Sequence, residues 1–376
     1  MLDKSKLIAQ LYKVADQLFL DYNPGQTVAR DVWQAICKDP LFIYKVRSVV
    51  NPPWPVPLWE GDLGVIMPIE LGLPAYMVLS VDGSQIYPDR HAFLSCFLIN
   101  TGSVVLPYGI PDSRVELLSE PTIFAGLDDD GVPFTTDTVN CKRQELELDQ
   151  GLNLAKRMVA GKELNTSLVI LFDGSLIFWH LSSKDIQVRD KFLHAYIAIL
   201  DQMYQEKIIT AWYISLPKSK ELVNLVRLFL CNFDVSQEHA YASIDKIIDT
   251  TILSHFLPPL SRTILFKNQS SITAQYPPQV HPHFFYINTG KEIARVEVPY
   301  WMTQDTTLID QIAAQIISQC HIGDGYPVTI AEAHEQAVVK GPDREFFYYM
   351  LDKLSLERNY HAISSVKSVR KTRMGF

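Results

Sequence analysis

The tripeptide Asp-Gly-Ser occurs twice in this chain, at Asp82 and at Asp173, each time after a run of mostly apolar residues. A carboxylate at the end of a buried strand is held at the rim of the sheet, and the following glycine lets another group come close. Two such aspartates on adjacent strands could share a divalent cation, which prefers oxygen ligands. Asp and Gly are also common in turns, so this motif alone leaves a metal site and plain turns as equal alternatives.

A third acid for the same cation could come from a helix predicted over residues 139–160. Glu147 lies close to the side of this helix that would pack on the sheet, on one face with Gly151 and Leu154. It could therefore project across the rim of the sheet. The simplest alternative is that the charged face of the helix is solvated, a face that includes Arg143, Glu145, Glu147 and Asp149.

Among the ten histidines, His334 is the strongest candidate for chemistry. It lies beside the apolar stripe of a helix predicted over residues 329–339, where a structural histidine of the core is the alternative. His281 and His283 are spaced by one residue and could hold a metal from a strand, but nearby prolines and the lack of nearby acids weaken that hypothesis.

Several common functional motifs are absent from the sequence. There is no G-x-S-x-G elbow, no phosphate-binding P-loop and no G-x-G-x-x-G, so we expect no binding of ATP or NAD by these devices. Five cysteines form no CxxC pair, which argues against a zinc knuckle or a disulfide framework. The N-terminus lacks the apolar region of a signal peptide, and residues 91–111 are broken by Asn-Thr-Gly. We therefore expect a cytoplasmic protein without a membrane span.

Composition describes an ordinary globular chain of 376 residues, 47% apolar and 20% charged. Its formal net charge is −8, from 34 basic and 42 acidic residues. A protein that grips a long duplex by charge alone is usually basic. Any nucleic-acid role would therefore need a local basic patch or bound metal ions. Residues 367–373 hold four cations, either as a solvated tail or as a phosphate contact.

The hydrophobic pattern predicts the elements that would position these residues. An antiparallel meander is expected over residues 76–81, 93–99 and 103–108, with turns at 82–84 and 100–102. Residues 168–172 read as a strand buried on both faces. The strand and helix patterns that follow predict a partly parallel sheet with helices on its faces, and they comprise helices at 190–205, 218–229, 306–319, 329–339 and 344–356, a strand at 209–215, and a hairpin formed by 284–287 and 293–298.

The chain divides into three predicted parts. Residues 1–70 combine a helical pattern with a proline-rich connector, and we expect a helical and irregular N-terminal appendage. Residues 71–358 would form the main domain. Residues 359–376 would form a basic C-terminal tail.

The motifs, taken in order, resemble those of the NurA nuclease family. The matching segments lie between residues 75 and 350 and read VDGSQIYPDRH, RQELELDQGLNLA, LVILFDGSLI, WYISLPKSKELVNLVR, VPYW and GYPVTIAEAHEQAVVKGPDRE. The resemblance implies an α/β fold with an RNase H-like mixed sheet. It also implies a DNA nuclease that uses one or two Mn²⁺ or Mg²⁺ ions, with single-strand endonuclease and 5′-to-3′ exonuclease activity in DNA end resection for double-strand break repair. Its implied partners are DNA, a second copy in a homodimer, and the hexameric ATPase HerA.

The resemblance also implies roles for individual residues. Metal ligation and catalysis would fall to Asp82, Glu147, Asp173 and His334, with Glu145 as a competing alignment for Glu147. The phosphate would be positioned by Tyr326 and, less securely because Pro217 displaces it, by Lys218.

Two other functions stay open at this point. The chain could be a non-catalytic scaffold that binds DNA or an ATPase and retains the fold, although its intact acids and His334 argue against this. It could also be a metal-dependent phosphohydrolase of small substrates, which would need a closed pocket.

Overall fold

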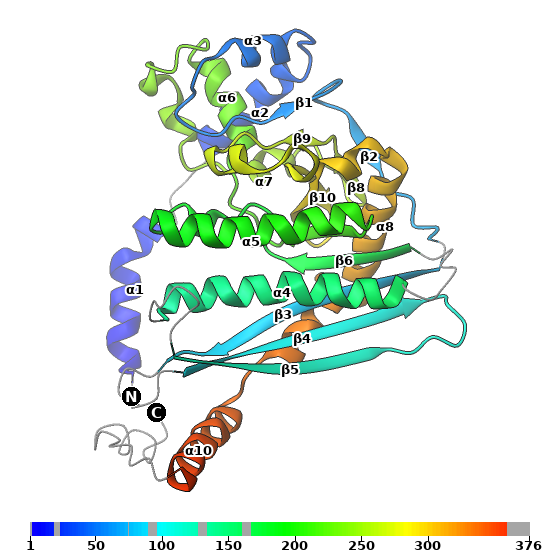
Figure 1. The fold of residues 1–376 in the computed structure, drawn as a ribbon. Helices are drawn as coiled ribbons and strands as arrows, with labels where there is room; N and C mark the ends of the chain where they lie inside the picture. Colours follow the sequence, from blue (N-terminus) through cyan, green and yellow to red (C-terminus); the bar gives the residue numbers. More distant parts are fainter. Residues whose placement is uncertain are drawn as a thin grey trace.

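A large mixed sheet forms the centre of the protein (Figure 1). The computed structural model describes residues 2–18, 23–73, 75–88, 96–126, 134–159 and 167–358; the basic tail predicted at 359–376 lies outside them. Within the described residues the sheet has eleven strands, in the order β1-β9-β10-β11-β7-β6-β3-β4-β5, with β8 paired to β10 and β2 to β8. Their bounds are β1 Leu58–Trp59, β2 Ile66–Pro68, β3 Tyr76–Ile86, β4 Cys96–Tyr108, β5 Glu116–Ala125, β6 Ser167–Asp173, β7 Ile209–Ile214, β8 Ser261–Thr263, β9 Phe266–Lys267, β10 Pro282–Asn288 and β11 Ile293–Pro299.

The central strands run in both directions. Strands β3, β4 and β5 form an antiparallel meander, β6 and β7 run parallel to β3, and β11 returns antiparallel to β7. The predicted combination of a meander with a partly parallel sheet is therefore confirmed. The predicted strands at 93–99 and 103–108 are wrong as separate strands, because they form the single strand β4. The true third strand, β5, was not predicted, because its irregular, largely exposed pattern gives no clear period.

Both turns predicted inside the meander are wrong. Residues 82–84 lie within β3 and residues 100–102 within β4, and Asp82 pairs with Gly102 across the two strands. Their polar side chains bind a helix instead of capping a turn. Ser84 Oγ donates to the carbonyl of Ala337 at 2.5 Å, and Asn100 Nδ2 donates to the same oxygen at 2.8 Å.

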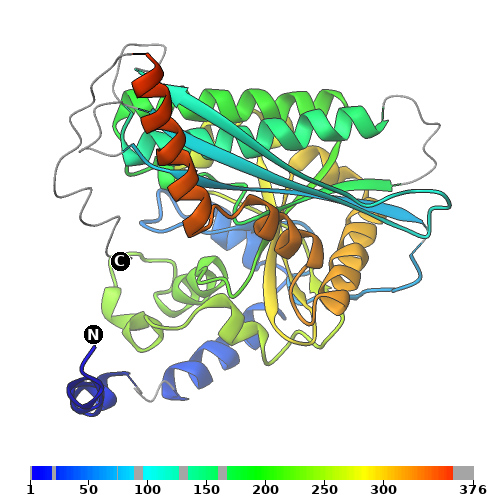
Figure 2. The same ribbon diagram turned by 90° about the horizontal axis from the view of Figure 1, so that it is seen from below.

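Helices cover both faces of the sheet (Figures 1 and 2). The helices α4 and α5 pack on one face, where Leu148 and Leu152 meet Ile170 and Phe172. On the other face lie α8 and α9, and α10 follows α9. The helices are α1 Lys4–Leu18, α2 Asn23–Ile36, α3 Phe42–Ser48, α4 Thr136–Val159, α5 Ile186–Gln205, α6 Glu221–Leu230, α7 Asp249–Leu253, α8 Thr306–Ile322, α9 Val328–Ala337 and α10 Gly341–Glu357, with short 3₁₀ turns η1 Trp179–Leu181, η2 Glu238–Ile244, η3 Ser271–Gln275, η4 Pro278–Val280 and η5 Tyr300–Gln304.

The N-terminal segment packs at one end of the sheet. Helices α2 and α3 share an apolar core with α6 and α7, in which Trp33 and Phe42 lie with Phe266 and Phe284. The strands β1 and β2 pair with β9 and β8. The segment contains helices, as expected, but it also adds two short strands to the sheet, which the sequence pattern did not predict. The domain boundary near residue 70 stays a prediction. No helix among the residues described above is both long enough and apolar enough to cross a bilayer.

Candidate active site

The two aspartates of the repeated motif lie on neighbouring strands at the same height. Strands β3 and β6 are parallel, and their last paired residues are Leu79 and Ile170. Asp82 and Asp173 each lie three residues beyond that pair. Both side chains point to the face covered by α8 and α9. Val78 lies four residues before Asp82 and Leu171 two residues before Asp173, so each shares a face with its aspartate, and both belong to the core beneath these helices. The sequence therefore predicted this juxtaposition correctly.

His334 of α9 reaches Asp82. Its Nδ1 lies 2.7 Å from Asp82 Oδ2, and its side chain is 64% exposed. The helix can approach β4 this closely because the residue opposite Asp82 is Gly102, where a Cβ would overlap the backbone nitrogen of Ala337. His334 is thus an exposed histidine at the rim of the sheet and not a histidine of the core.

Tyr326, which precedes α9, binds the other aspartate. Its hydroxyl donates to Asp173 Oδ1 at 2.9 Å, and its ring packs edge-on against Tyr213 of β7. Burial raises the pKa of Tyr326, so the hydroxyl stays protonated and remains a donor. Asp173 reaches solvent at the rim, yet the surrounding protein raises the pKa of its carboxyl. Tyr326 partly offsets this effect, and the charge of Asp82 adds to it.

Glu147 approaches the same aspartates from the opposite face of the sheet. Burial raises the pKa of its carboxyl to about 8; Arg143 works against that shift, whereas Asp82 and Asp173 add to it. The effect of burial on the Glu147 pKa is larger than that of Arg143, whose Nε lies 3.5 Å from Glu147 Oε1. Glu145 instead pairs with Lys142 at 2.8 Å on the side of the helix. These contacts favour Glu147 over Glu145 as the third acid.

The glycine of the first Asp-Gly-Ser motif makes this approach possible. Gly83 faces α4, and a Cβ there would lie 2.6 Å from Glu147 Oε1 and 2.7 Å from Arg143 Cγ. The second glycine has a different role. Gly174 has a φ of +88°, which favours glycine, and it turns the chain after β6. The motif at Asp173 is therefore the turn that the sequence suggested, whereas the motif at Asp82 is a close helix–strand contact.

Arg143 is a site residue to which sequence reasoning gave no role. Its Nη1 donates to the carbonyl of Gly83 at 2.8 Å, next to Asp82. The signal was present in its spacing, because Arg143 precedes Glu147 by one helical turn and so shares its face.

Two sequence candidates lie elsewhere. Lys218 lines a cavity of about 480 Å³ that Gly174 and Ser175, directly after Asp173, also line, but no hydrogen bond or ion pair of the described residues joins Lys218 to the aspartates. His283 Nδ1 donates to the carbonyl of His281, 3.1 Å away, and burial lowers the pKa of His283 to about 4. Within the described parts of the chain, no three His, Cys, Asp or Glu side chains lie close enough together to form a ready metal site, either at His281 and His283 or at the two aspartates.

The acidic rim nevertheless has the donor set of a cation site. Glu147 Oε1 is buried and has no hydrogen-bond partner among the described residues. Its contact with Arg143 is a long ion pair, and a buried acceptor that receives no hydrogen bond is costly. The nearby aspartates raise that cost through their charge. Carboxylate oxygens with one imidazole are ligands that suit Mn²⁺ or Mg²⁺. The residues present therefore fit a divalent cation.

Comparison with known proteins identifies the class of this chain. The model of the NurA domain family matches residues 77–339, the region that holds all four carboxylate and histidine candidates. The chain belongs to the NurA domain family.

Solved structures give weaker likenesses. A crystal structure of NurA is 12% identical, with a TM-score of 0.36, and the match covers 94% of this chain and 98% of that one. A structure of NurA with manganese is 11% identical, with a TM-score of 0.37 and coverages of 92% and 98%. A third, NurA bound to dAMP and manganese, is 12% identical, with a TM-score of 0.34 and coverages of 90% and 94%. No curated protein matches the chain.

Proposed function

We propose that this chain is a divalent-metal-dependent deoxyribonuclease. The observation that carries the proposal is that Asp82 and Asp173 lie on neighbouring strands of a NurA domain, each three residues beyond the last pair, with the buried Glu147 of α4 near enough that burial and then the charges of both aspartates raise its pKa. Like charges gathered at one place repel each other unless a cation binds between them. Membership of the family brings manganese into consideration as that cation.

The metal ligands we propose are Asp82, Asp173 and Glu147, with His334 as a ligand or as the group that orients Asp82. One or two Mn²⁺ or Mg²⁺ ions would activate water and stabilise the leaving oxygen of a phosphodiester. The chain's own residues hold the acids in place. His334 fixes Asp82 and Tyr326 fixes Asp173, through the contacts given above. A phosphate could approach from the exposed side of the imidazole, where His334 could also take or give a proton.

We assign the sheet to the RNase H-like class. The order β5-β4-β3-β6-β7, with three antiparallel strands followed by two strands parallel to β3, supports this assignment. In open sheets of this kind, sites lie beyond the carboxyl ends of the parallel strands, which is where Asp173 ends β6.

DNA is the substrate that we propose, cut by single-strand endonuclease and 5′-to-3′ exonuclease activity during end resection. An open site supports a polymer over a small molecule, because the side chain of His334 is 64% exposed and that of Asp82 is 21% exposed. A phosphohydrolase of small substrates would enclose its ligand more fully. A non-catalytic scaffold would have no need of the partnered aspartates.

We also propose a homodimer that works with a HerA-type hexameric ATPase. The sequence has no nucleotide-binding loop of its own, so a motor would have to be a separate protein. Helix α1 supports an assembly, because it exposes Leu7, Ile8 and Leu11 to solvent. Light scattering at micromolar concentration tests the dimer, and a mass of 42.8 kDa unchanged by DNA would contradict it.

A gel assay with linear DNA tests the proposed function. We expect cleavage with Mn²⁺, none with a chelator, and none for Asp82→Asn or Asp173→Asn. Cleavage that survives in either variant at wild-type rate would refute the proposed site. A small phosphate ester hydrolysed faster than DNA would favour the phosphohydrolase instead.

A further inference from the structure

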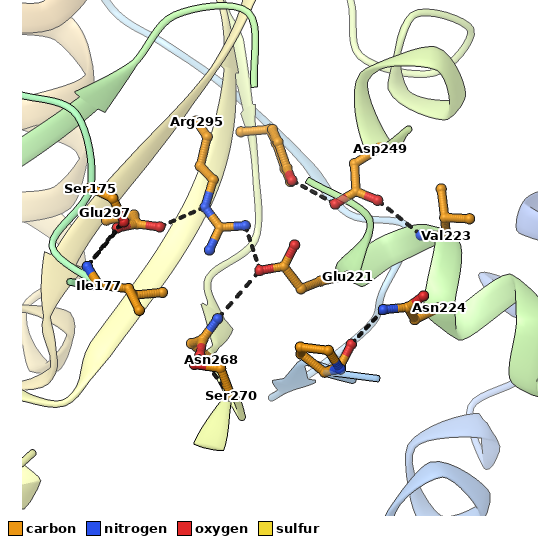
Figure 3. A network of polar contacts seen from close by, with 12 residues as sticks. Ser175, Ile177, Glu221, Val223, Asn224, Asp249, Asn268, Ser270, Arg295 and Glu297 are labelled. Atoms are coloured by element: carbon orange, nitrogen blue, oxygen red, sulfur yellow. Dashed lines mark hydrogen bonds and ion pairs between the residues drawn. The ribbon is translucent and has the colours of Figure 1, made fainter. Parts of the chain in front are cut away.

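A buried charge network lies on the face of the sheet opposite Asp173 (Figure 3). Its centre is Arg295 of β11, which donates from Nη1 to Glu221 Oε1 and from Nε to Glu297 Oε1, both at 2.8 Å. Arg295 and Glu297 are each 1% exposed, and Glu221 is 7% exposed. The guanidinium also lies 3.7 Å from the centre of the Phe284 ring. A buried set of charges is seldom more stable than apolar side chains of the same size, so stability alone does not account for this network.

The second oxygen of Glu297 binds the segment that follows Asp173. Glu297 Oε2 accepts from Ser175 Oγ at 2.8 Å, from the backbone nitrogen of Leu176 at 2.8 Å and from that of Ile177 at 3.4 Å. Ser175 Oγ in turn accepts from the nitrogen of Ile177 at 3.0 Å. One carboxylate therefore gathers the donors of three successive residues, directly after the Asp-Gly pair.

Further contacts fix the same segment on both sides. The nitrogen of Gly174 donates to the carbonyl of Tyr213 at 3.0 Å. The hydroxyl of Tyr276 donates to the carbonyl of Leu176 at 2.9 Å and accepts from the nitrogen of Phe178 at 3.2 Å. Residues 176–178 are at most 1% exposed. The chain that leaves Asp173 is thus anchored at every residue from 174 to 178.

Sheet register explains how Glu297 reaches this segment. Glu297 of β11 pairs with Trp212 of β7, and Trp212 pairs with Phe172 of β6. The three residues form one row across the sheet, on the face away from the aspartates. Asp173 is the next residue along β6 and points to the other face, where Tyr326 binds it.

We propose that Glu297, oriented by Arg295, is the positioning residue for Asp173. It fixes the backbone of the 174–178 segment, so that the carboxylate is presented at one height beside Asp82. This inference rests on the proposed function in taking Asp173 as a metal ligand. Residues that orient a ligand from behind commonly change metal affinity or activity by about 10–100-fold when they are replaced.

Two variants and a matched control test the proposal. Glu297→Gln keeps the shape of the side chain but replaces one acceptor oxygen with an NH₂ donor. One oxygen now faces Arg295 and the other faces the segment, so the variant loses an acceptor on one of these two sides. Ser175→Ala removes one donor and leaves no buried charge behind. The control is Asp249→Asn. Asp249 is another fully buried carboxylate and accepts from the nitrogen of Val223 at 2.9 Å and the hydroxyl of Tyr286 at 2.6 Å. It interacts with Glu221 through charge, so it borders the network, but it bonds neither Glu297 nor the 174–178 segment.

The readouts are Mn²⁺ affinity by electron paramagnetic resonance and amide hydrogen exchange of the metal-free protein. We expect Glu297→Gln to weaken Mn²⁺ binding by about 10–100-fold and to speed exchange at residues 175–178. Ser175→Ala should shift both readouts in the same direction by less. Asp249→Asn should lower the melting temperature and leave both readouts unchanged.

Each other result contradicts the proposal. Wild-type Mn²⁺ affinity in folded Glu297→Gln would refute it, and if that variant does not fold, wild-type affinity in Ser175→Ala would refute it instead. An equal loss of affinity in Asp249→Asn would show a general effect of stability and would also refute it. A different result would refute the proposed function: wild-type protein that binds Mn²⁺ but cuts no DNA. The two tests are independent because this one measures Mn²⁺ affinity and hydrogen exchange, not cleavage.

Discussion

The close contact at Gly83 makes a sharp prediction about the substitution Gly83→Ala. The backbone of Gly83 does not lie in the left-handed region, so alanine can adopt it without strain. The added Cβ would lie 2.6 Å from Glu147 Oε1, whereas ordinary contacts begin at 3.4 Å. A shift of 0.8 Å by the carboxylate or the strand would restore an ordinary contact, and Arg143 Cγ at 2.7 Å limits how far the carboxylate can withdraw along α4.

The substitution should affect activity far more than folding. Overpacking of this size usually costs about 1–3 kcal/mol of unfolding free energy. A displacement of nearly 1 Å at a catalytic group can cost about 10²-fold in rate. We therefore expect Gly83→Ala to remain folded, with a modestly lower melting temperature, and to lose about 10²-fold of its Mn²⁺-dependent cleavage per folded molecule.

The matched control is Gly151→Ala on α4, the helix that Gly83 faces. Its Cβ would lie 2.8 Å from Phe172 Cζ, a similar overlap in the apolar core behind the site. Turnover on linear single-stranded DNA, measured with the folded fraction from circular dichroism, should stay near wild type in this control. The reasoning is refuted if Gly83→Ala cuts DNA within about threefold of wild type, or if both variants lose activity equally.

Three further predictions concern the individual acids and the histidine. The pKa of Glu147 is raised from an ordinary 4.5 to about 8, so without metal the folded protein holds a proton that the unfolded chain loses. The unfolding free energy of the protein should therefore fall as pH rises from about 5 to 8, by up to about 1.4 kcal/mol per pH unit. Urea titrations should find this pH dependence reduced in Glu147→Gln. Asp82→Asn and Asp173→Asn should abolish cleavage yet keep or raise the melting temperature in chelator, because each removes a charge that opposes ionisation of its neighbours; unfolding of both variants would show that these residues are structural. His334→Ala should lower turnover by about 10²–10⁴-fold with little change in stability, since its ring is mostly exposed, and His334→Asn should recover part of the loss if the ring serves to orient Asp82; wild-type turnover in the alanine variant would exclude both roles.

Local patterns were sufficient to predict most elements after residue 136. The wholly apolar run of β6 and the amphipathic periods of α4, α5 and α8 each report burial directly. They also place Asp173 at the end of its strand and Glu147 on the face toward the sheet. Asp82 and Asp173 could be expected to meet because each follows an apolar run that reads as a buried strand, although β3 continues past Asp82 to Ile86 instead of ending there.

The remaining features depend on contacts between distant segments. Asp82 and Gly83 resemble a turn in sequence, and only α9 on one side and α4 on the other make them part of a strand. The role of Glu297 cannot be predicted from its neighbours in sequence either, because it reads as an ordinary charged residue of an alternating strand. Its role depends on contact with Ser175, which is 122 residues away in the chain. Tertiary contacts determine the conformation and role of such residues, and these contacts cannot be predicted from local patterns in a single sequence.

The distance along the chain between Asp82 and His334 has a consequence for synthesis. The two residues are 252 positions apart, and Tyr326 follows Asp173 by 153 positions. During translation the acids emerge long before the helix that orients them, so a nascent chain has carboxylates without their partners. We expect a polypeptide that ends before α9 to be harmless to DNA. If the proposed function holds, the order of the segments would delay cleavage until nearly the whole domain has been made.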